Sequence, residues 1–308
     1  MTELFENLKD CKLCPRNCNA DRYSDKLGYC GSDAGYHISS IVLHKGEEPV
    51  ISGENGICNV FFSRCNLQCI YCQNLQISCN QGVVISRAYS LEEVIAEIIA
   101  ILELHQINTV GFVSPSHYVP HVIEIIESLR LNGRNPITVY NTNAYEKAST
   151  IRLLESYISV YLPDFKYLDH ELAKELSDAS NYPDKAILAI KEMYRQKGST
   201  LIKNDEGLAE SGLIIRHLVL PDQIENSLKV LRFIAEELSP DISLSLMAQY
   251  YPLEKLKHHP FLNRKLTVSE YEVVVKEAEK LGFHRGWIQE LESTETYLPD
   301  FKKNEPFS

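Results

Sequence analysis

Residues 61–74 read FFSRCNLQCIYCQN, in which Cys65, Cys69 and Cys72 follow a C-x3-C-x2-C spacing. Three thiolates bind three irons of a [4Fe-4S] cubane, whereas a cluster that only transfers electrons is normally closed by four cysteines. The spacing therefore predicts a cluster with one iron open to an exogenous ligand. The alternatives are a structural zinc site, which needs a fourth ligand that this loop does not offer, and a group of free thiols.

Around this stretch, short apolar runs alternate with amphipathic helical segments, which is typical of a parallel sheet built from βα units. Six strands are expected, at residues 57–63, 109–113, 137–141, 158–162, 213–220 and 242–247. Ser90 and Glu93 form a capping-box pattern at the start of one helix. Later helices are expected to begin near Pro120, Pro183, Ile224 and Ser269. Periodicity alone does not separate a partial barrel from a flat doubly wound sheet.

The composition fits a globular chain of 308 residues, with 44% hydrophobic and 24% charged residues. We expect a cysteine-rich metal-binding segment over residues 1–50, a barrel over 51–290 and a tail over 291–308. A net charge of -11 without basic runs argues against nonspecific nucleic-acid binding. The N-terminus is charged and no apolar window is long enough for a bilayer, so the expectation is a cytoplasmic protein with no membrane partner.

A second group of cysteines precedes the predicted barrel. It combines a C-x2-C-x3-C spacing with a more distant cysteine and consists of Cys11, Cys14, Cys18 and Cys30. Four thiolates form a closed set that suits either zinc or a [4Fe-4S] cluster, and the spacing leaves this choice open. Free thiols are the alternative. Cys58 and Cys79 are interpreted as small buried residues without a ligand role.

Several motifs resemble those of one family. The loop at Cys65, with Tyr71 before its last cysteine, resembles the signature of the radical S-adenosylmethionine (radical SAM) superfamily. Other stretches are similar to the uncharacterised branch related to pyruvate formate-lyase activating enzyme: CKLCPRNC at 11–18, SPSHY at 114–118, YLPDFKY at 161–167, RHLVLP at 216–221 and MAQY at 247–250. The resemblance extends from Cys11 to about Gln289. It implies an α/β fold, a partial (β/α)6 barrel with the cluster loop after its first strand.

The resemblance also implies the chemistry. The open iron would bind S-adenosylmethionine through its amino and carboxylate groups, and reductive cleavage would give a 5′-deoxyadenosyl radical. Such a radical SAM oxidoreductase needs a reductant of flavodoxin or ferredoxin type. The first hypothesis is activation of a glycyl radical enzyme. The alternatives are radical modification of another peptide or a small molecule, and a noncatalytic iron-sulfur electron-transfer protein.

Site residues are expected at the carboxyl ends of the strands, where ligands gather in parallel α/β folds. By resemblance, Tyr71 lies near the adenine. Activating enzymes carry a Gly-Gly-Glu turn after the second strand, but this chain has Ser114 near that position. The Ser114 hydroxyl, with that of Ser116, either takes the place of the turn or caps a turn around Pro115.

Polar residues follow two other strands. Asn141 and Asn143 are expected to bond ribose or carboxylate oxygens of the cofactor, with an Asx-type turn as the alternative. Gln249 and Tyr250, at the end of the last strand, are further candidates for cofactor or substrate contacts.

Charged residues complete the predicted site. Asp164 and Lys166 resemble the Asp-x-Lys of the activating enzymes and would share one face of a continued strand. Arg216 lies inside an apolar run, so its burial requires a counter-charge, either the methionyl carboxylate or a protein carboxylate. His217 would face the opposite side as a packing residue.

Two departures from the family pattern concern loop geometry. Arg64 and Asp222 stand where relatives often have glycine or Pro-Gly.

Overall fold

Seven parallel strands form the centre of the structure, a computed structural model that describes residues 2–291, 299–303 and 305–307. The sheet order is β10-β9-β8-β6-β5-β4-β2-β1-β3, with β1 antiparallel to β2, β3 antiparallel to β1, and β7 paired to β8. The strands are β1 (Tyr36–His44), β2 (Ile57–Phe62), β3 (Arg87–Tyr89), β4 (Thr109–Val113), β5 (Ile137–Thr142), β6 (Val160–Pro163), β7 (Ile202–Lys203), β8 (Ala209–Leu218), β9 (Ser243–Met247) and β10 (Gly286–Ile288).

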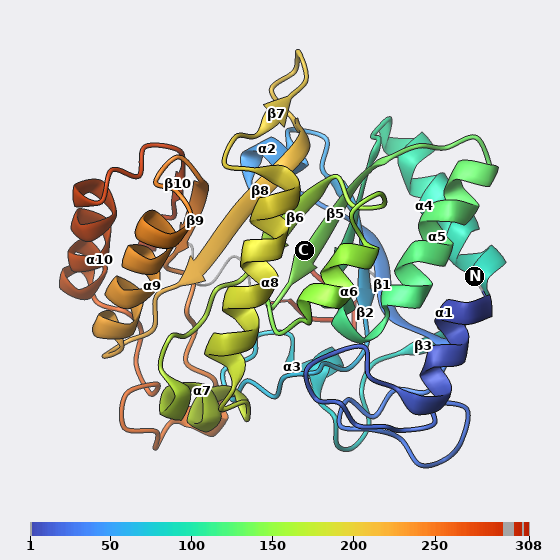
Figure 1. Cartoon of the computed structure of the whole chain (residues 1–308), viewed down its shortest axis with the longest axis horizontal. Helices are drawn as coiled ribbons and strands as arrows, with labels where there is room; N and C mark the ends of the chain where they lie inside the picture. The colour runs from blue at the N-terminus through green and yellow to red at the C-terminus, as the bar shows by residue number, and fades with distance from the viewer. Residues whose placement is uncertain (1, 292–298, 304, 308) are drawn as a thin grey trace.

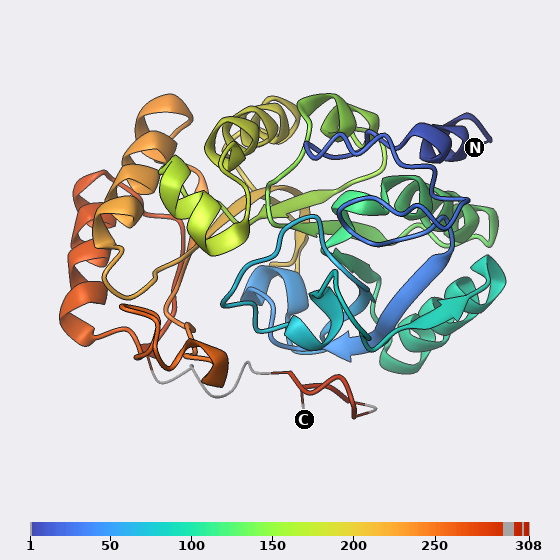
Figure 2. The same cartoon turned by 90° about the horizontal axis from the view of Figure 1, so that it is seen from below.

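The long helices lie along the outside of this curved sheet, as Figures 1 and 2 show from two directions. The α-helices are α1 (Thr2–Glu6), α2 (Pro49–Ser52), α3 (Leu75–Ser78), α4 (Leu91–His105), α5 (Val119–Leu131), α6 (Ala148–Leu153), α7 (His170–Ser177), α8 (Tyr182–Lys197), α9 (Ile224–Glu237) and α10 (Val268–Lys280). Three short 3-10 helices are η1 (Asn7–Asp10), η2 (Pro115–His117) and η3 (Glu254–Leu256).

The predicted fold class is confirmed: the six expected strands correspond to β2, β4, β5, β6, β8 and β9, all parallel and in chain order. The capping box of Ser90 and Glu93 is present at the start of α4. β1 lies within residues 1–50, so the cysteine-rich segment also supplies a strand of the sheet. Half of the predicted tail, residues 292–298, 304 and 308, lies outside the described residues. No helix in the described ranges is long and apolar enough to cross a bilayer.

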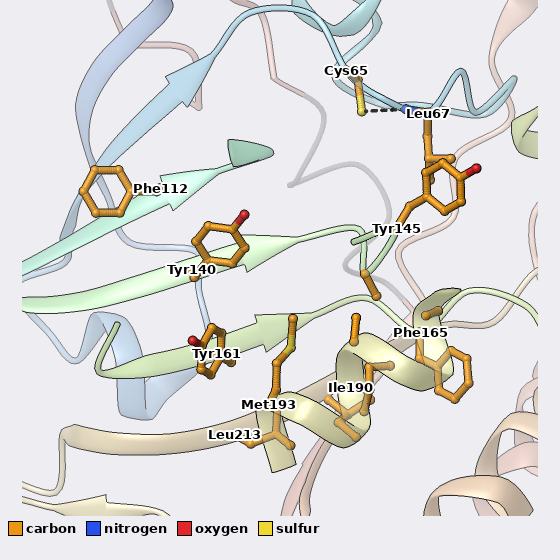
Figure 3. Packing of buried hydrophobic residues seen from close by; sticks show 14 of the residues in the cluster. Cys65, Leu67, Phe112, Tyr140, Tyr145, Tyr161, Phe165, Ile190, Met193 and Leu213 are labelled. Carbon is orange, nitrogen blue, oxygen red and sulfur yellow. Dashed lines mark hydrogen bonds between the residues drawn. The ribbon is translucent and has the colours of Figure 1, made fainter. Parts of the chain in front are cut away.

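The outer face of the sheet carries large buried side chains. Phe112, Tyr140 and Tyr161 occupy one register row on β4, β5 and β6. Figure 3 shows these rings projecting from neighbouring strands, with Ile190 and Met193 of α8 in the same cluster. All five side chains are fully or almost fully buried. Burial of this apolar surface holds the helices on the outside and leaves the inner face for the site.

The inner face is closed at its amino-terminal end by the short helix α2. Val50 and Ile51 of this helix pack in one cluster with Ile57, Val139 and Val160, residues near the starts of β2, β5 and β6. This apolar cluster fills the interior of the barrel at the end where the strands begin. As a consequence, the two residues that directly precede α2, both glutamates, lie inside the barrel.

One glycine makes room for a polar side chain in this interior. Gly111 on β4 is the register partner of Asn59 on β2, and a Cβ at position 111 would lie 2.0 Å from the Asn59 side-chain oxygen. Any larger residue would displace Asn59, whose amide donates a hydrogen bond of 3.0 Å to Glu47.

Candidate functional site

A cavity of about 380 Å³ opens at the carboxyl ends of the parallel strands. It brings together the three cluster cysteines and eight of the residues predicted to contact the cofactor, but not Ser116. The lining includes Cys65, Cys69, Cys72, Tyr71, Ser114, Asn141, Asn143, Asp164, Lys166, Arg216 and Gln249. These residues come from the loop after β2 and from the ends of β4, β5, β6, β8 and β9, so the barrel collects them at one edge.

Each of the three cysteine sulfurs accepts a hydrogen bond from a neighbouring side chain. The Asn143 amide donates to Cys65 (3.4 Å), the Ser177 hydroxyl to Cys69 (3.0 Å), and the Ser78 hydroxyl to Cys72 (3.3 Å). The backbone N–H of Leu67 also donates to the Cys65 sulfur at 3.4 Å, as drawn in Figure 3. The sulfurs are thus oriented by donors from three separate elements.

Burial raises the pKa of Cys65 to about 12 and that of Cys69 above its ordinary value. A thiolate at either position therefore needs a nearby positive charge, which a metal ion bound there would supply. Within the described ranges, no three His, Cys, Asp or Glu side chains lie close enough together to bind a single metal ion.

Tyr71 is held by a chain of hydroxyl groups. Its OH is hydrogen-bonded to the OH of Tyr167, which is bonded to Ser177 at 2.9 Å, and Ser177 donates to Cys69. The Tyr71 ring also contacts the ring of Tyr250 edge to face. The predicted cofactor-binding tyrosine is therefore connected to a cysteine ligand through two other side chains.

Arg216 binds two carboxylates and one amide of the protein. Its Nε donates to Asp164 (2.7 Å), its Nη1 to Glu47 (3.3 Å) and its Nη2 to Asn141 (2.6 Å). The counter-charge expected from the sequence is thus provided by protein carboxylates. Arg216 consequently needs no cofactor carboxylate for neutralisation, and Asp164 and Glu47 take that role.

Lys166 contacts the second carboxylate oxygen of Asp164, whereas Arg216 contacts the first. Its ammonium donates to Asp164 at 2.8 Å, which agrees with the expectation that both residues share one face. Burial disfavours the Asp164 carboxylate, but Arg216 and Lys166 outweigh this effect and hold its pKa below the ordinary value. An ammonium has three N–H groups, so Lys166 retains donors for a further anion.

Glu47 and Glu48 are site residues that the sequence interpretation missed. Glu47 accepts from Asn59, Asn141 and Arg216. Glu48 is 8% exposed, and its Oε2 has no hydrogen-bond partner. Burial raises the pKa of Glu48. The sequence feature that could have revealed them is the pair of glutamates in HKGEEP at 44–49, which directly follows an apolar run.

The remaining predicted residues differ in whether they face the cavity or pack within the protein. Ser114 lines the cavity with a left-handed backbone (φ 54°) before η2, so it forms a turn and faces the site at once. Ser116 points away: its hydroxyl donates to the buried carboxylate of Glu146 at 2.6 Å. Gln249 accepts from Gln289 at 2.9 Å. His217 is bonded on both ring nitrogens to the protein, as a packing residue would be.

Arg64 and Asp222 have φ values of 68° and 61°. Both therefore adopt the left-handed conformation that glycine adopts most easily. Arg64 is held there by hydrogen bonds from its guanidinium to the carbonyls of Cys79 and Asn80.

Aromatic residues from the end of the chain complete the cavity wall. Phe307 lines the cavity and its ring lies 4.2 Å from His44 and 5.6 Å from Phe61. Phe301 packs on Phe61 at 5.3 Å, and its backbone N–H donates to Gln76. The described part of the tail is therefore docked against the side of the site that β2 forms.

The second cysteine group surrounds a small cavity of its own. Cys11, Cys14, Cys18 and Cys30 all line it. Cys14 and Cys30 are buried, whereas Cys18 is exposed. The backbone N–H of Tyr29 donates to the Cys18 sulfur at 3.3 Å, and burial raises the pKa of Cys14 to about 12. Cys58 is buried in the core, and the Cys79 thiol donates to the Gln81 carbonyl; neither lines the two cavities.

The chain is similar in sequence to one protein family and to one curated protein. Residues 59–205 match the family described as the Radical SAM superfamily. The uncharacterized protein MJ0674 of Methanocaldococcus jannaschii is 32% identical over 287 residues, which cover 90% of this chain and 77% of that protein.

Two solved structures are similar in shape. HydG, described as a maturase of the [FeFe]-hydrogenase, has a TM-score of 0.51 at 13% identity, covering 81% of this chain and 56% of HydG. SuiB of Streptococcus suis, solved with bound S-adenosylmethionine, has a TM-score of 0.48 at 17% identity, covering 75% of this chain and 50% of SuiB. This chain therefore spans about half the length of either protein, and the likeness to HydG concerns the fold alone.

Proposed function

The chain belongs to the radical SAM superfamily, and we propose that this radical SAM enzyme acts on a protein partner, in which it installs a glycyl radical. The observation that carries the proposal is the single cavity that joins three cysteine sulfurs to a buried network of charges. The partner comes from the motif resemblance to pyruvate formate-lyase activating enzyme.

The residues present fit the cofactors of the superfamily, a [4Fe-4S] cluster and S-adenosylmethionine. Three buried or half-buried thiols face the cavity, and its volume is within the range of cofactor pockets. Two residues of the wall carry buried polar atoms for which the described ranges offer no hydrogen-bond partner, Glu48 Oε2 and His44 Nδ1. Unpaired atoms of this kind are expected where a polar ligand binds.

When bound, the cluster supplies one electron to the sulfonium of S-adenosylmethionine, and the cofactor supplies the 5′-deoxyadenosyl radical that abstracts a hydrogen atom. Cys65, Cys69 and Cys72 would hold three of its irons. Lys166 offers its remaining N–H groups to the methionyl carboxylate, and Asp164 keeps the ammonium in place at 2.8 Å.

The other residues of the wall position these groups and exclude water. Arg216 fixes Asn141 and Asp164 at hydrogen-bond distance, so that two predicted cofactor contacts are held by one buried cation. Tyr71 and Phe307 add apolar surface on different sides of the cavity. A dry wall protects a reactive radical from stray hydrogen donors.

The test is anaerobic incubation of the reconstituted chain with S-adenosylmethionine, a low-potential reductant and each glycyl radical enzyme of its own cell. The expected result is a glycyl radical signal in the electron paramagnetic resonance (EPR) spectrum of one partner, and its absence with Cys69→Ala. Formation of 5′-deoxyadenosine without a glycyl radical on any partner would contradict the proposed substrate and favour another peptide or a small molecule. No cofactor cleavage at all would favour the noncatalytic alternative.

The proposal includes two further components. Cys11, Cys14, Cys18 and Cys30 bind either zinc or an iron-sulfur cluster, supported by the cavity that they share; in the described ranges their thiols line this cavity without converging on one ion, so binding would draw them closer together. The electron comes from a protein of flavodoxin or ferredoxin type, since the cluster must be reduced before each cleavage or activation.

A further inference from the structure

The cavity among the N-terminal cysteines contains polar atoms that the protein leaves unpaired. His117 lines it and is 2% exposed; its Nε2 is bonded to the Ser63 carbonyl at 3.0 Å, but its Nδ1 has no hydrogen-bond partner among the described residues. Arg16 also lines the cavity, and its Nη2 is buried without a partner in the same part of the chain. Buried polar atoms are rarely unpaired in folded proteins, so these two indicate an occupant that is absent from the chain itself.

One side of this cysteine group is connected to the loop that holds the first cluster. Arg16 stands between Cys14 and Cys18 in the sequence. Its Nε donates to the carbonyl of Asn66 at 2.9 Å, and Asn66 directly follows Cys65. A single side chain thus spans from the N-terminal ligands to the neighbour of a cluster ligand.

The other side makes a second connection to the same loop. Cys30 stands between Tyr29 and Gly31. The Tyr29 carbonyl accepts from Asn80 at 2.6 Å, and the Asn80 carbonyl accepts from Arg64 at 2.9 Å. A Cβ on Gly31 would lie 3.1 Å from the Arg64 guanidinium. Arg64 precedes Cys65, so both halves of the N-terminal group contact residues that flank this ligand.

The exposure of the ligands differs across the group. Cys18 is exposed to solvent, whereas Cys14 and Cys30 are buried on the side of the connections just described. Figure 2 shows the dark-blue N-terminal segment beside the light-blue loop that follows β2. A redox centre bound by these cysteines would be accessible to a protein reductant on the side of Cys18. Its buried side, at Cys14 and Cys30, would face the loop that carries the first cluster.

We infer that Cys11, Cys14, Cys18 and Cys30 hold a second [4Fe-4S] cluster that relays electrons to the cluster at Cys65, Cys69 and Cys72. The ligand set alone suits zinc equally well. We base the choice on location: contacts with both neighbours of Cys65 put this group beside the first cluster, where an iron-sulfur cluster could pass electrons and a redox-inactive zinc ion could not. The inference rests on the proposed function, since the relay serves a cluster that must be reduced.

The electron balance of the relay is simple. A reduced protein of flavodoxin or ferredoxin type gives one electron to the N-terminal cluster. That cluster passes the electron to the first cluster and returns to its oxidised state. No bond is formed or broken and no proton is transferred in either step.

Metal content is the first test. The anaerobically reconstituted wild-type chain is expected to contain about eight irons and eight sulfides, two cubanes, with no stoichiometric zinc. Reduction should give two EPR signals, of which one changes when S-adenosylmethionine is added. The double variant Cys14→Ser/Cys30→Ser should retain about four irons. The control Cys79→Ser, a thiol outside both groups, should retain all of them.

The second test compares reductants by the rate of 5′-deoxyadenosine formation. With a protein reductant, the double variant should be slower than wild type by about tenfold or more, because the entry point is gone. With dithionite, which reaches the open cluster directly, the two rates should agree within about twofold. Arg16→Gln leaves all nine cysteines in place and should retain the full iron content while slowing only the reaction with the protein reductant.

Zinc together with four irons in the wild-type chain would overturn the relay, and this measurement does not depend on how any variant folds. Equal rates of the double variant and wild type with the protein reductant would also overturn it. If the double variant and Arg16→Gln each lose rate equally with the protein reductant and with dithionite, the N-terminal cysteine group has a structural role instead. Failure of the proposed function would appear differently: both clusters and the reductant effect would be present without a glycyl radical.

Discussion

The hydroxyl of Ser177 lies 3.0 Å from the sulfur of Cys69 and donates a hydrogen bond to it. Ser177 is the last residue of α7, far from the cluster loop in sequence. Hydrogen bonds to cluster sulfurs stabilise the reduced state, which carries more negative charge, and so raise the reduction potential. With Cys69 as a cluster ligand, as proposed, this hydrogen bond from a helix end would raise the potential of the cluster.

Replacing Ser177 with Ala removes this donor, and we expect the potential of the first cluster to fall by a few tens of millivolts, on the order of one hydrogen bond. Redox titration followed by EPR measures the shift. Ser227→Ala is the matched control, since Ser227 is a buried helix serine whose hydroxyl is bonded to His217 and not to a cysteine. An unchanged potential in Ser177→Ala would show that this contact does not tune the cluster.

Cys69→Ala is expected to abolish cleavage of S-adenosylmethionine, because a cubane left with two protein ligands is not retained. Cys79→Ala should leave cleavage intact, since its thiol is bonded only to the Gln81 carbonyl. Chromatographic detection of 5′-deoxyadenosine distinguishes the two. The reverse pattern would refute the ligand assignment.

Arg216→Ala leaves Asp164 and Glu47 without their shared cation in a buried site. Removing one partner of a buried ion pair usually costs about 3–5 kcal/mol, and a loss of this size is expected in urea denaturation. Arg87→Ala is the comparison: Arg87 pairs with Glu93 and Glu97 but is exposed, so its loss should cost less than about 1 kcal/mol. Similar losses in both variants would argue against a buried network around Arg216.

Glu146 gives the protein a pH dependence of stability. Ser116, Thr142 and Tyr140 all donate to its Oε1, while its Oε2 is buried without a partner. Burial is the dominant effect and raises its pKa from 4.5 to about 7, although the three donors oppose it. The folded protein thus binds this proton more tightly than the unfolded chain does.

The stability that comes from protonated Glu146 is therefore fully present below pH 4.5 and is lost as the pH rises to about 7. Over this window, wild type should lose on the order of 3 kcal/mol relative to Glu146→Gln, whose side chain does not titrate. Urea denaturation at a series of pH values gives the difference. A constant difference between the two proteins from pH 4.5 to 7 would show that Glu146 titrates normally.

Four of the six strands that the sequence predicted, β2, β4, β6 and β9, are buried at every position, as expected for strands that are covered on both faces. β5 is buried at all positions but its first, and β8 is buried from residue 212 to 215. β1 was missed because it is buried only at every third residue and its register shifts between Ile38 and Ser40. β3 and β10 have three residues each and are largely exposed, which leaves no pattern to detect.

The residues of the candidate site also fall into two groups, those that the sequence could reveal and those that it could not. Asn141, Asp164 and Arg216 could be found because parallel strands bring their carboxyl ends to one edge. Ser177 and Ser78 could not, because they reach the sulfurs only through the packing of α7 and α3. The sequence showed that Arg216 needs a counter-charge, but the choice between cofactor and protein carboxylate depended on the path of the loop before α2, which carries Glu47.

The wall of the cavity combines segments that lie far apart in the sequence: Glu47 comes from the loop before α2, and Phe307, whose ring centre lies 4.2 Å from that of His44, comes from the described part of the tail. Displacement of Phe307 would therefore enlarge the cavity on the side of β2 while the parallel strands keep their positions.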